Sequence, residues 1–498
     1  MHDMKTSFLI LISLSIFLSR CSQKKEEPPT LSEENKIVNE NKNAGTTAWL
    51  INVPEKHCDY PDHQYCRRSQ IEGFCSKASY FTGDTLNIFI STDPATTYTI
   101  DIYRMGYYGG KGGRLMKPGE PQHGKAQPVP TAGKNNLIEC KWDTAYAMAI
   151  PQEWMSGVYL GKLTTQDSSQ SYVVFVLKDQ RKADVLFQCS DMTWQAYNRW
   201  PYWHAMYDEG QKPWVNTNGA RISFDRPYSS YLNALPMDFA PLSNGSGEFL
   251  LWEFPLAFWL EKEGYDVTYI SETDTHADAD GLLRTKAYLS VGHDEYWTPT
   301  MVANVKHARD EGVNLLFLCG NSVDGVVYLD KSWDGRPNRI TGRLPQREMS
   351  DEEELMGSSS YGVGYGDIVW KNTNHWMFEG TNIKAGDVTK ELIGWEYHGF
   401  PVKKDSSLIV IGSGKILPNK FADDNPPDHV VTIYTAPKGN FVFNAGTCFW
   451  NLPLSTPPGS QTPVNNQGNQ GKKIVGYVKD DPRIQRITKN LLDKALSF

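Results

Sequence analysis

The chain has 498 residues, of which 40% are hydrophobic and 22% are charged. This balance is typical of a globular protein with more than one core, because a single core rarely organises more than about 250–300 residues. The formal charge of −8, without a long basic stripe in the sequence, argues against nucleic acid as a partner.

The start of the chain predicts export and attachment to a membrane. The apolar run 8–18 is too short for a transmembrane helix and is typical of a secretory signal over residues 1–20. Cys21 follows in a Leu-Ser-Arg-Cys string that resembles a bacterial lipobox, although Arg20 replaces the usual small residue. Cys21 is therefore the candidate lipidation site, and the polar residues 21–47 are expected to form a disordered tether. We expect a lipid-anchored protein of a bacterial membrane, in the periplasm or at the cell surface.

Residues 48–180 alternate between apolar and polar side chains in short segments and show no helical pattern of convincing length. This pattern predicts an immunoglobulin-like β-sandwich, with its clearest strands at 85–91, 97–104, 157–163 and 171–177. A loop at 103–114, rich in glycine and tyrosine, lacks the Lys-Ser/Thr ending of a phosphate-binding loop. We expect this loop to pack against a second domain.

The cysteines predict two kinds of environment. Four of them fall in the first domain, where some are expected to pair in an oxidising compartment, with three connectivities left open; these are Cys58, Cys66, Cys75 and Cys140. Their spacing lacks the close CxxC pair of a structural zinc site. Three others close apolar segments and are expected to be packing residues rather than nucleophiles; these are Cys189, Cys319 and Cys448.

From residue 181 to 498 the pattern changes to strands that alternate with helices. The expected strands are 184–189, 266–270, 286–291, 313–318, 407–411, 429–435 and 440–443, and the expected helices are 249–263, 299–311 and 482–496. Strand–helix alternation indicates right-handed crossovers and a parallel sheet, so the predicted class of this domain is α/β.

The most informative segment is the run 288–297, Tyr-Leu-Ser-Val-Gly-His-Asp-Glu-Tyr-Trp. Its apolar part stops at Gly292, and His293, Asp294 and Glu295 follow at once. Thr298 and the proline after it then form a good helix start. Because open α/β folds place their chemistry at the carboxyl ends of their strands, we expect a functional site here, with a solvated polar turn as the alternative.

Several strings together carry a family resemblance. They are Asp-Met-Thr-Trp-Gln-Ala-Tyr-Asn at 191–198, Phe-Asp-Arg-Pro-Tyr at 224–228, Gly-His-Asp-Glu-Tyr-Trp at 292–297, Cys-Gly-Asn-Ser at 319–322 and Tyr-Arg-Met-Gly-Tyr-Tyr-Gly-Gly at 103–110. In this order the chain resembles the large (β) subunit family of N,N-dimethylformamidase. The resemblance implies a flavodoxin-like catalytic domain, shaped like class I glutamine amidotransferases without their cysteine nucleophile. It also implies a mononuclear iron held by two tyrosines and one glutamate.

Carried onto this sequence, the resemblance makes Glu295 the glutamate ligand and Tyr197 the first tyrosine ligand. Tyr228 is the expected second tyrosine, and Tyr231 is the alternative. His293 matches the histidine that lies two positions before the glutamate, where its pKa suits a role in proton transfer.

Two further positions complete the expected site. Asn321, at the end of the neighbouring strand, is a candidate orienter of a carbonyl group or a water molecule. The family also uses a late glutamate, and the matching segment here carries Thr435 at the expected acidic position. This departure bears on the hydrolytic activity even if the metal site itself is retained.

Phenolate and carboxylate oxygens are hard donors, which suit a ferric ion better than copper(I) or structural zinc. The leading hypothesis is therefore iron-dependent hydrolysis of the C–N bond of a small amide, with either a homo-oligomer or a separate small subunit as a possible assembly. The alternative is a non-catalytic surface lipoprotein that binds a glycan or peptide through the sandwich and the aromatic loops. A glycoside hydrolase that uses Asp294 or Glu295 is the weaker third reading, because no second carboxylate has an identifiable place.

Overall fold

The structure is a computed structural model that describes residues 35–52, 67–208, 220–229, 244–342, 349–417, 425–460 and 480–498. The predicted signal, Cys21, Cys58, Cys66 and Tyr231 lie outside these residues. Among the residues that are described, no helix has the length and apolar character needed to span a membrane.

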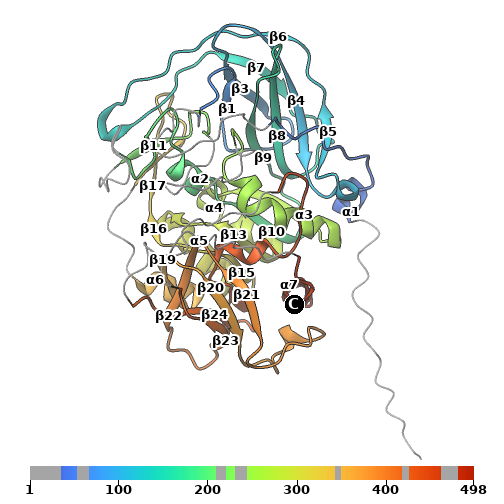
Figure 1. Cartoon of the computed structure of the whole chain (residues 1–498), viewed down its shortest axis with the longest axis vertical. Coiled ribbons are helices and arrows are strands. Elements are labelled where there is room, and N and C mark those ends of the chain that lie inside the picture. Colours follow the sequence, from blue (N-terminus) through green and yellow to red (C-terminus); the bar gives the residue numbers. More distant parts are fainter. Residues whose placement is uncertain are drawn as a thin grey trace, which may run out of the picture. The chain divides into compact units, whose positions relative to one another are not determined.

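The N-terminal part contains two sheets that share a core (Figure 1). One sheet has the order β2-β9-β8-β4-β5 with β6 beside β4; its strands are β2 (Ser79–Tyr80), β4 (Thr97–Met105), β5 (Gly113–Lys117), β6 (Gln122–His123), β8 (Gly157–Thr165) and β9 (Gln170–Leu177). The other has the order β1-β3-β7, formed by β1 (Glu72–Cys75), β3 (Thr85–Ser91) and β7 (Thr144–Ala149). Alternate residues of both sheets, such as Ile88 and Ile100, fill the space between them.

The described residues of the second part form a mixed sheet of 11 strands. Five neighbouring strands run parallel in the order β12 (Val267–Ser271), β10 (Ala183–Cys189), β13 (Thr285–His293), β15 (Asn314–Gly320) and β25 (Phe441–Asn444). The sheet then continues through antiparallel pairs of β24 (His429–Thr435), β23 (Ile409–Gly414), β20 (Gly366–Trp370), β21 (Val388–Ile393), β22 (Glu396–Val402) and β19 (Ser358–Val363).

The expected fold class is therefore wrong: the domain is not a flavodoxin-like parallel sheet of the class I glutamine amidotransferase type. The described chain is rich in strands, and its sheet is mixed, with an antiparallel half that such a fold lacks. Much of the difference arises in residues 358–402, where four strands follow one another without a long helix between them. Parallel neighbours need a crossover of about a dozen residues or more, whereas strands joined by short connections pair antiparallel.

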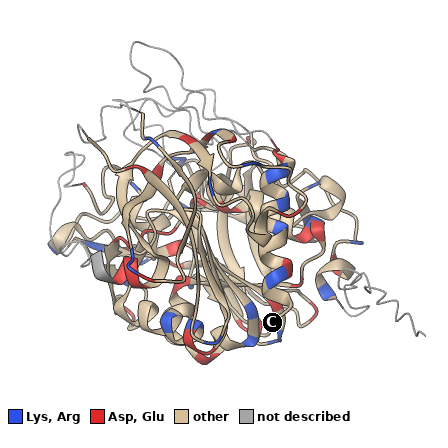
Figure 2. Ribbon diagram, turned by 90° about the horizontal axis from the view of Figure 1, so that it is seen from below, with Lys and Arg blue, Asp and Glu red and all other residues tan. Residues whose placement is uncertain are grey.

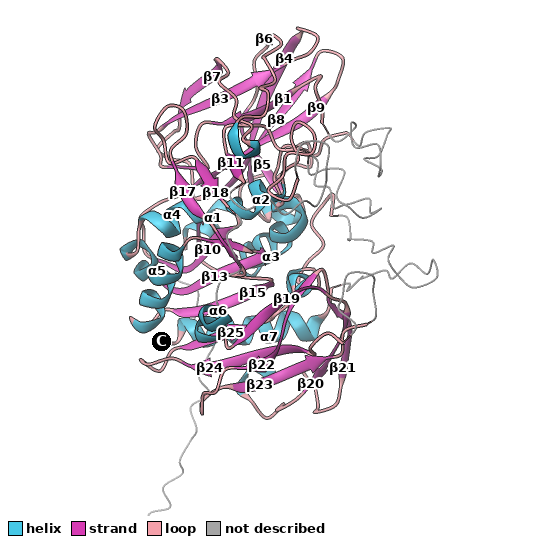
Figure 3. Cartoon of the chain, turned by 90° about the vertical axis from the view of Figure 1, so that its left-hand side faces the viewer, coloured by secondary structure: helices cyan, strands magenta, loops and turns pink. Residues whose placement is uncertain are grey.

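Helices cover both faces of the parallel strands. Apolar residues of α3 (Phe254–Glu263) and α7 (Pro482–Leu496) pack with Val185, Leu289 and Leu316. Those of α2 (Asp191–Tyr197) and α5 (Pro299–Asp310) pack with the alternate residues Leu186, Tyr288 and Leu315. Figure 3 shows α5 beside β10, β13 and β15. Successive residues of a strand point to opposite faces of the sheet, so alternate residues of the same strands pack against the two different sets of helices.

The remaining elements are short. They are α1 (Lys36–Glu40), α4 (Glu272–Ala277), α6 (Met349–Met356), a π-helix η5 (Phe249–Glu253), and the 3₁₀ turns η2 (Tyr108–Gly110), η3 (Lys134–Asn136), η6 (Asp280–Arg284), η7 (Trp376–Phe378) and η8 (Cys448–Asn451). Two small sheets pair β11 (Arg221–Ser223) with β18 (Arg339–Thr341) and β17 (Tyr328–Asp330), and β14 (Tyr296–Trp297) with β16 (Gly325–Val326). Acidic and basic residues are interspersed along the ribbon (Figure 2).

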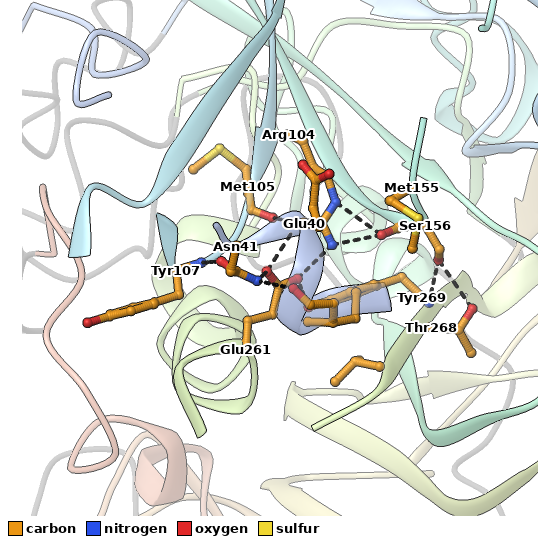
Figure 4. Close-up of polar contacts among 12 residues, drawn as sticks. Glu40, Asn41, Arg104, Met105, Tyr107, Met155, Ser156, Glu261, Thr268 and Tyr269 are labelled. Carbon is orange, nitrogen blue, oxygen red and sulfur yellow. Dashed lines mark hydrogen bonds and ion pairs between the residues drawn. The ribbon is translucent and has the colours of Figure 1, made fainter. Parts of the chain in front are cut away.

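A buried polar network joins the N-terminal sheets to α3 (Figure 4). Arg104 on β4 and Glu261 on α3 have fully buried side chains and approach to 2.7 Å between Nη2 and Oε1. Glu261 also accepts hydrogen bonds from Asn41 at 2.8 Å and Tyr269 at 3.1 Å. A Cβ atom at Gly106 would lie 2.3 Å from Glu261 Oε2, so glycine is needed in this loop for the close approach. The loop packs against α3, as its aromatic and glycine content predicted.

Candidate metal centre

The end of β13 delivers three ionisable side chains into the protein interior. Gly292 has a φ of +73°, and a Cβ atom there would lie 2.6 Å from Cβ of Trp252 in the π-helix. Only glycine permits this combination of backbone conformation and close packing. His293, Asp294 and Glu295 follow, and each is at most 3% exposed. The structure places this group in the core rather than in a solvated turn, the alternative that the sequence left open.

Asp294 braces the strand end instead of facing the other two side chains. Its carboxylate accepts hydrogen bonds from Gln188 at 2.9 Å, Ser290 at 2.5 Å and Trp297 at 2.9 Å. The backbone N–H groups of Glu295 and Tyr296 donate to Thr193 Oγ1 on α2, at 3.0 and 3.1 Å. Because α2 also carries Tyr197, this contact fixes the position of Glu295 relative to that tyrosine.

His293, Glu295 and Glu396 form a group that could hold a metal ion, with one ligand atom of each lying within 4.8 Å of the others. His293 Nε2 is 2.5 Å from Glu396 Oε2 and 3.5 Å from Glu295 Oε2. Two phenols reach the same glutamate: Tyr197 donates to Glu295 Oε2 at 2.5 Å, and Tyr207 donates to Oε1 at 2.8 Å. The two hydroxyl oxygens are 3.1 Å apart.

The close approach of β15 and β22 brings Glu396 to this group. Gly320 ends β15, and a Cβ atom there would lie 2.2 Å from the carbonyl oxygen of Glu396 and 2.7 Å from the backbone nitrogen of Cys448. Asn321 follows with a φ of +55°, and its side chain forms a hydrogen bond with Glu396. The turn after β15 therefore positions both the backbone and the carboxylate of Glu396.

Burial and charge shift the pKa values of the group in opposite directions. Burial lowers the pKa of His293, but the Glu396 carboxylate, with Glu248 and Glu295, more than reverses this effect and raises it well above the usual value. Burial raises the pKa of Glu295, but hydrogen bonding and attraction to His293 outweigh burial and leave it lowered. Burial is the main reason that the pKa values of Glu396 and Tyr197 are raised.

The residues fit a hard cation. Three buried carboxyl groups, those of Glu248, Glu295 and Glu396, surround a single imidazole, which leaves an excess of acidic groups in a region from which water is excluded. Both nitrogens of His293, Oε2 of Glu396 and both carboxyl oxygens of Glu248 lack a well-aligned hydrogen bond. Buried charges need a counter-ion or a metal, and oxygen-rich donor sets suit hard metal ions.

The structure brings some of the predicted residues together and separates another. Tyr197, His293 and Glu295 are in mutual contact, and Asn321 reaches the group through Glu396. The hydroxyl of Tyr228 instead forms a hydrogen bond with Gln195, and its ring lies edge-on to Trp194 at 6.3 Å. Among the described residues, Tyr207 is the second tyrosine whose hydroxyl donates a hydrogen bond to Glu295.

Three members of the site were not predicted: Tyr207, Glu248 and Glu396. Thr435, where the late glutamate was expected, is exposed at the end of β24, whereas Glu396 contacts His293. The sequence did carry a signal for Glu396, because it is the single carboxylate in the string Gly-Trp-Glu-Tyr at 394–397. Tyr207 lies in a long connection without periodicity, so no comparable signal marked it.

None of the cysteines that the structure describes takes part in this group. Cys75 and Cys140 are buried free thiols, so the expected pairing does not involve these two within the described structure. Cys189, Cys319 and Cys448 are buried and free, which confirms the prediction that they are packing residues. Burial raises the pKa of the Cys448 thiol to about 12, which disfavours a nucleophilic thiolate.

Fold and site together define a β-rich protein with a buried carboxylate–histidine–tyrosine centre suited to a hard cation. The sequence model of a family described as "N,N-dimethylformamidase beta subunit-like, C-terminal" matches residues 99–467. The chain belongs to this family, as the sequence strings predicted.

The comparisons with individual proteins are more distant. The N,N-dimethylformamidase beta subunit of Paracoccus aminophilus is 23% identical over 225 residues, which cover 40% of this chain and 30% of that protein. The match thus spans less than a third of that relative's length. The N-terminal domain of mmIFT52 has 12% identity and a TM-score of 0.25 over 38% of this chain and 75% of that chain. A Paenibacillus cycloisomaltooligosaccharide glucanotransferase has 8% identity and a TM-score of 0.17 over 74% of this chain and 70% of that chain. Neither structural likeness bears on the fold or the function.

Proposed function

We propose that the chain is an exported, lipid-anchored hydrolase that uses a metal ion to cleave the C–N bond of a small amide. One observation carries the proposal: His293, Glu295 and Glu396 form a buried metal-ligating group, with two phenols on Glu295, in a member of the dimethylformamidase β-subunit-like family. Attachment through Cys21 to a bacterial membrane rests on the sequence of the first 47 residues.

Iron is the proposed metal, because its ferric ion prefers phenolate and carboxylate oxygens. Glu295, Tyr197 and Tyr207 are the proposed oxygen donors, and His293 and Glu396 lie against them. Such an ion would supply Lewis-acid polarisation of the amide carbonyl. Deprotonation of the two phenols would contribute negative charge that the ion neutralises.

The chain's own residues account for the movement of protons. Hydrolysis breaks the amide C–N bond, adds the oxygen of water to the carbonyl carbon and moves a proton to the departing nitrogen. Glu396 and His293, 2.5 Å apart, are proposed to take the proton from water and deliver it to that nitrogen. Asn321, which is hydrogen-bonded to Glu396, holds that carboxylate in place; its Oδ1 has no hydrogen-bond partner among the described residues and is proposed as a further acceptor.

The first experiment is to measure metals and the visible spectrum of the purified exported chain. About one iron per chain and a tyrosinate-to-iron absorption band are expected. The band should weaken in Tyr197→Phe and in Tyr207→Phe and persist in Tyr228→Phe, because the Tyr228 hydroxyl bonds Gln195. Loss of the band in Tyr228→Phe alone would overturn the assignment of Tyr207.

Activity is tested with Glu396→Gln, which keeps the shape of the side chain. Loss of a general acid–base group typically reduces kcat by about 10²–10⁴-fold. We expect this loss towards a small amide such as formamide. Unchanged kcat in Glu396→Gln, with wild-type metal content, would remove Glu396 from the reaction.

The alternative, a surface lipoprotein that binds a glycan, has one observation in its favour. Tyr328 on β17 and Trp333 after it are 46% and 49% exposed, and such aromatic side chains stack on sugars. Retention on a glycan array that is lost in Trp333→Ala, combined with no bound metal, would favour this function over hydrolysis.

A further inference from the structure

A small cleft borders the metal-ligating group, because Tyr197 and Glu248 line it and contact Glu295 and His293. Its cavity volume is about 10 Å³, and it is lined by Trp194, Tyr197, Asn198, Tyr228, Ser229, Gly247 and Glu248. Tyr197 forms part of its wall and donates to Glu295, so the cleft ends beside the proposed reaction centre. A space of this size is close to the least that one water molecule needs, so it admits one small polar group of a ligand rather than a whole ligand.

Nearly all polar side chains on the wall already use their hydrogen-bonding groups within the protein. The contacts are Trp194 to Glu253 at 2.8 Å, Tyr197 to Glu295 at 2.5 Å, Asn198 to the carbonyl of Pro227 at 2.9 Å, Ser229 to Asn198 at 3.2 Å, and Tyr228 to Gln195. Among these described lining residues, only Glu248 retains buried polar atoms without a hydrogen-bond partner.

Glu248 is 1% exposed and directly precedes the π-helix η5. Its Oε2 lies 3.5 Å from Nδ1 of His293, and neither Oε1 nor Oε2 accepts a well-aligned hydrogen bond. Oε2 faces His293, so Oε1 is the oxygen that has no donor among the described residues. A buried carboxylate oxygen without a donor is energetically unfavourable, so a ligand that brings an N–H group is stabilised there. The rings of Trp194 and Tyr228 line the same cleft and favour a group with positive character.

We infer that the cleft selects ligands that donate an N–H group to Glu248. This inference rests on the proposed function. The substrate is then a small amide that retains at least one N–H, rather than a fully N-alkylated amide. A site built to bond an N–H group discriminates against analogues that lack it, because the acceptor is left buried and unpaired. Glu248 is thus a specificity residue, distinct from the groups proposed to move protons.

The test compares kcat/KM for formamide, N-methylformamide and N,N-dimethylformamide in the metal-loaded protein. The first two, which keep an N–H, should be preferred over the third by about tenfold to a hundredfold, the usual range for a hydrogen bond to a charged group. Glu248→Gln, which keeps one acceptor, should reduce this ratio, and Glu248→Met should abolish it. Glu311→Gln, at an exposed carboxylate paired with Lys438, serves as the control and should leave the ratio unchanged.

Two outcomes would overturn the inference. The first is a wild-type protein that shows no preference for the N–H-bearing amides. The second is an equal loss of activity towards all three amides in Glu248→Met, because that result would assign Glu248 only to orienting His293.

A binding measurement separates this inference from the proposed function. If the wild type hydrolyses none of the three amides, hydrolysis fails as the function, and the cleft is then tested with methylammonium by titration calorimetry. Binding that weakens at least about tenfold in Glu248→Met, with no comparable binding of methanol, would support the inference without the reaction. Methylammonium binding that is absent or independent of Glu248 would refute it.

Discussion

Gly320→Ala is expected to damage the metal centre without removing any of its side chains. The new Cβ atom would lie 2.2 Å from the carbonyl oxygen of Glu396 and 3.0 Å from Sγ of Cys448. A carbon atom normally approaches a carbonyl oxygen no closer than about 3.3 Å, so the backbone at Glu396 has to retreat by about 1 Å. Overpacking of this kind costs about 1–3 kcal/mol of stability. A displacement of that size at Glu396, a group proposed to move protons, can also reduce activity by about 10²-fold.

The assay for Gly320→Ala combines kcat, the metal content per chain and the free energy of unfolding in urea. We expect a stability loss in the stated range and a fall in kcat of about 10²-fold. Gly133→Ala is the matched control, because its new Cβ atom would meet nothing closer than 3.5 Å and its φ of −86° suits alanine. Wild-type kcat in Gly320→Ala would refute the reasoning, since it would mean that the Glu396 segment moves freely or does not take part in the reaction.

Three further predictions concern stability and the site. Arg104→Met leaves the buried Glu261 carboxylate without its cation and should cost about 3–5 kcal/mol in urea unfolding, part of which Glu261→Gln in the same chain should recover; additive losses would contradict the pairing. Thr435→Ala should leave the metal content unchanged, because that side chain is exposed. Loss of metal in this variant would instead support position 435 as the place of the late glutamate, as the sequence predicted. Burial lowers the pKa of His429 to about 4 from 6.5, so the unfolded chain binds the extra proton between these values and stability should rise with pH across this window, by about 3 kcal/mol, and level off above it. Unfolding midpoints of wild type and His429→Gln measure that slope, and equal slopes would contradict the assignment.

The local signals in the sequence located strands and the centre of the site, but they misjudged the fold class. The strand predicted over 286–291 is observed as β13, which runs on through Gly292 to His293; it was readable because apolar runs and glycine stops act locally. Strands β19–β22 were absent from the predicted strands, and without them the sheet was predicted to be parallel. Strand direction depends on which strands pair and on how long the connections between them are. The hydrophobic periodicity of the sequence contains no information on either.

The sequence by itself determined the family and placed Tyr197, His293 and Glu295 in one site, since these residues lie in short strings whose order identifies them. Only the tertiary structure decided that Glu396 and Tyr207 join that site and that Tyr228 turns to Gln195. Glu396 lies more than a hundred residues from His293 along the chain. Its place follows from a contact between β15 and β22 at Gly320, and contacts between distant segments are set by packing of the whole core.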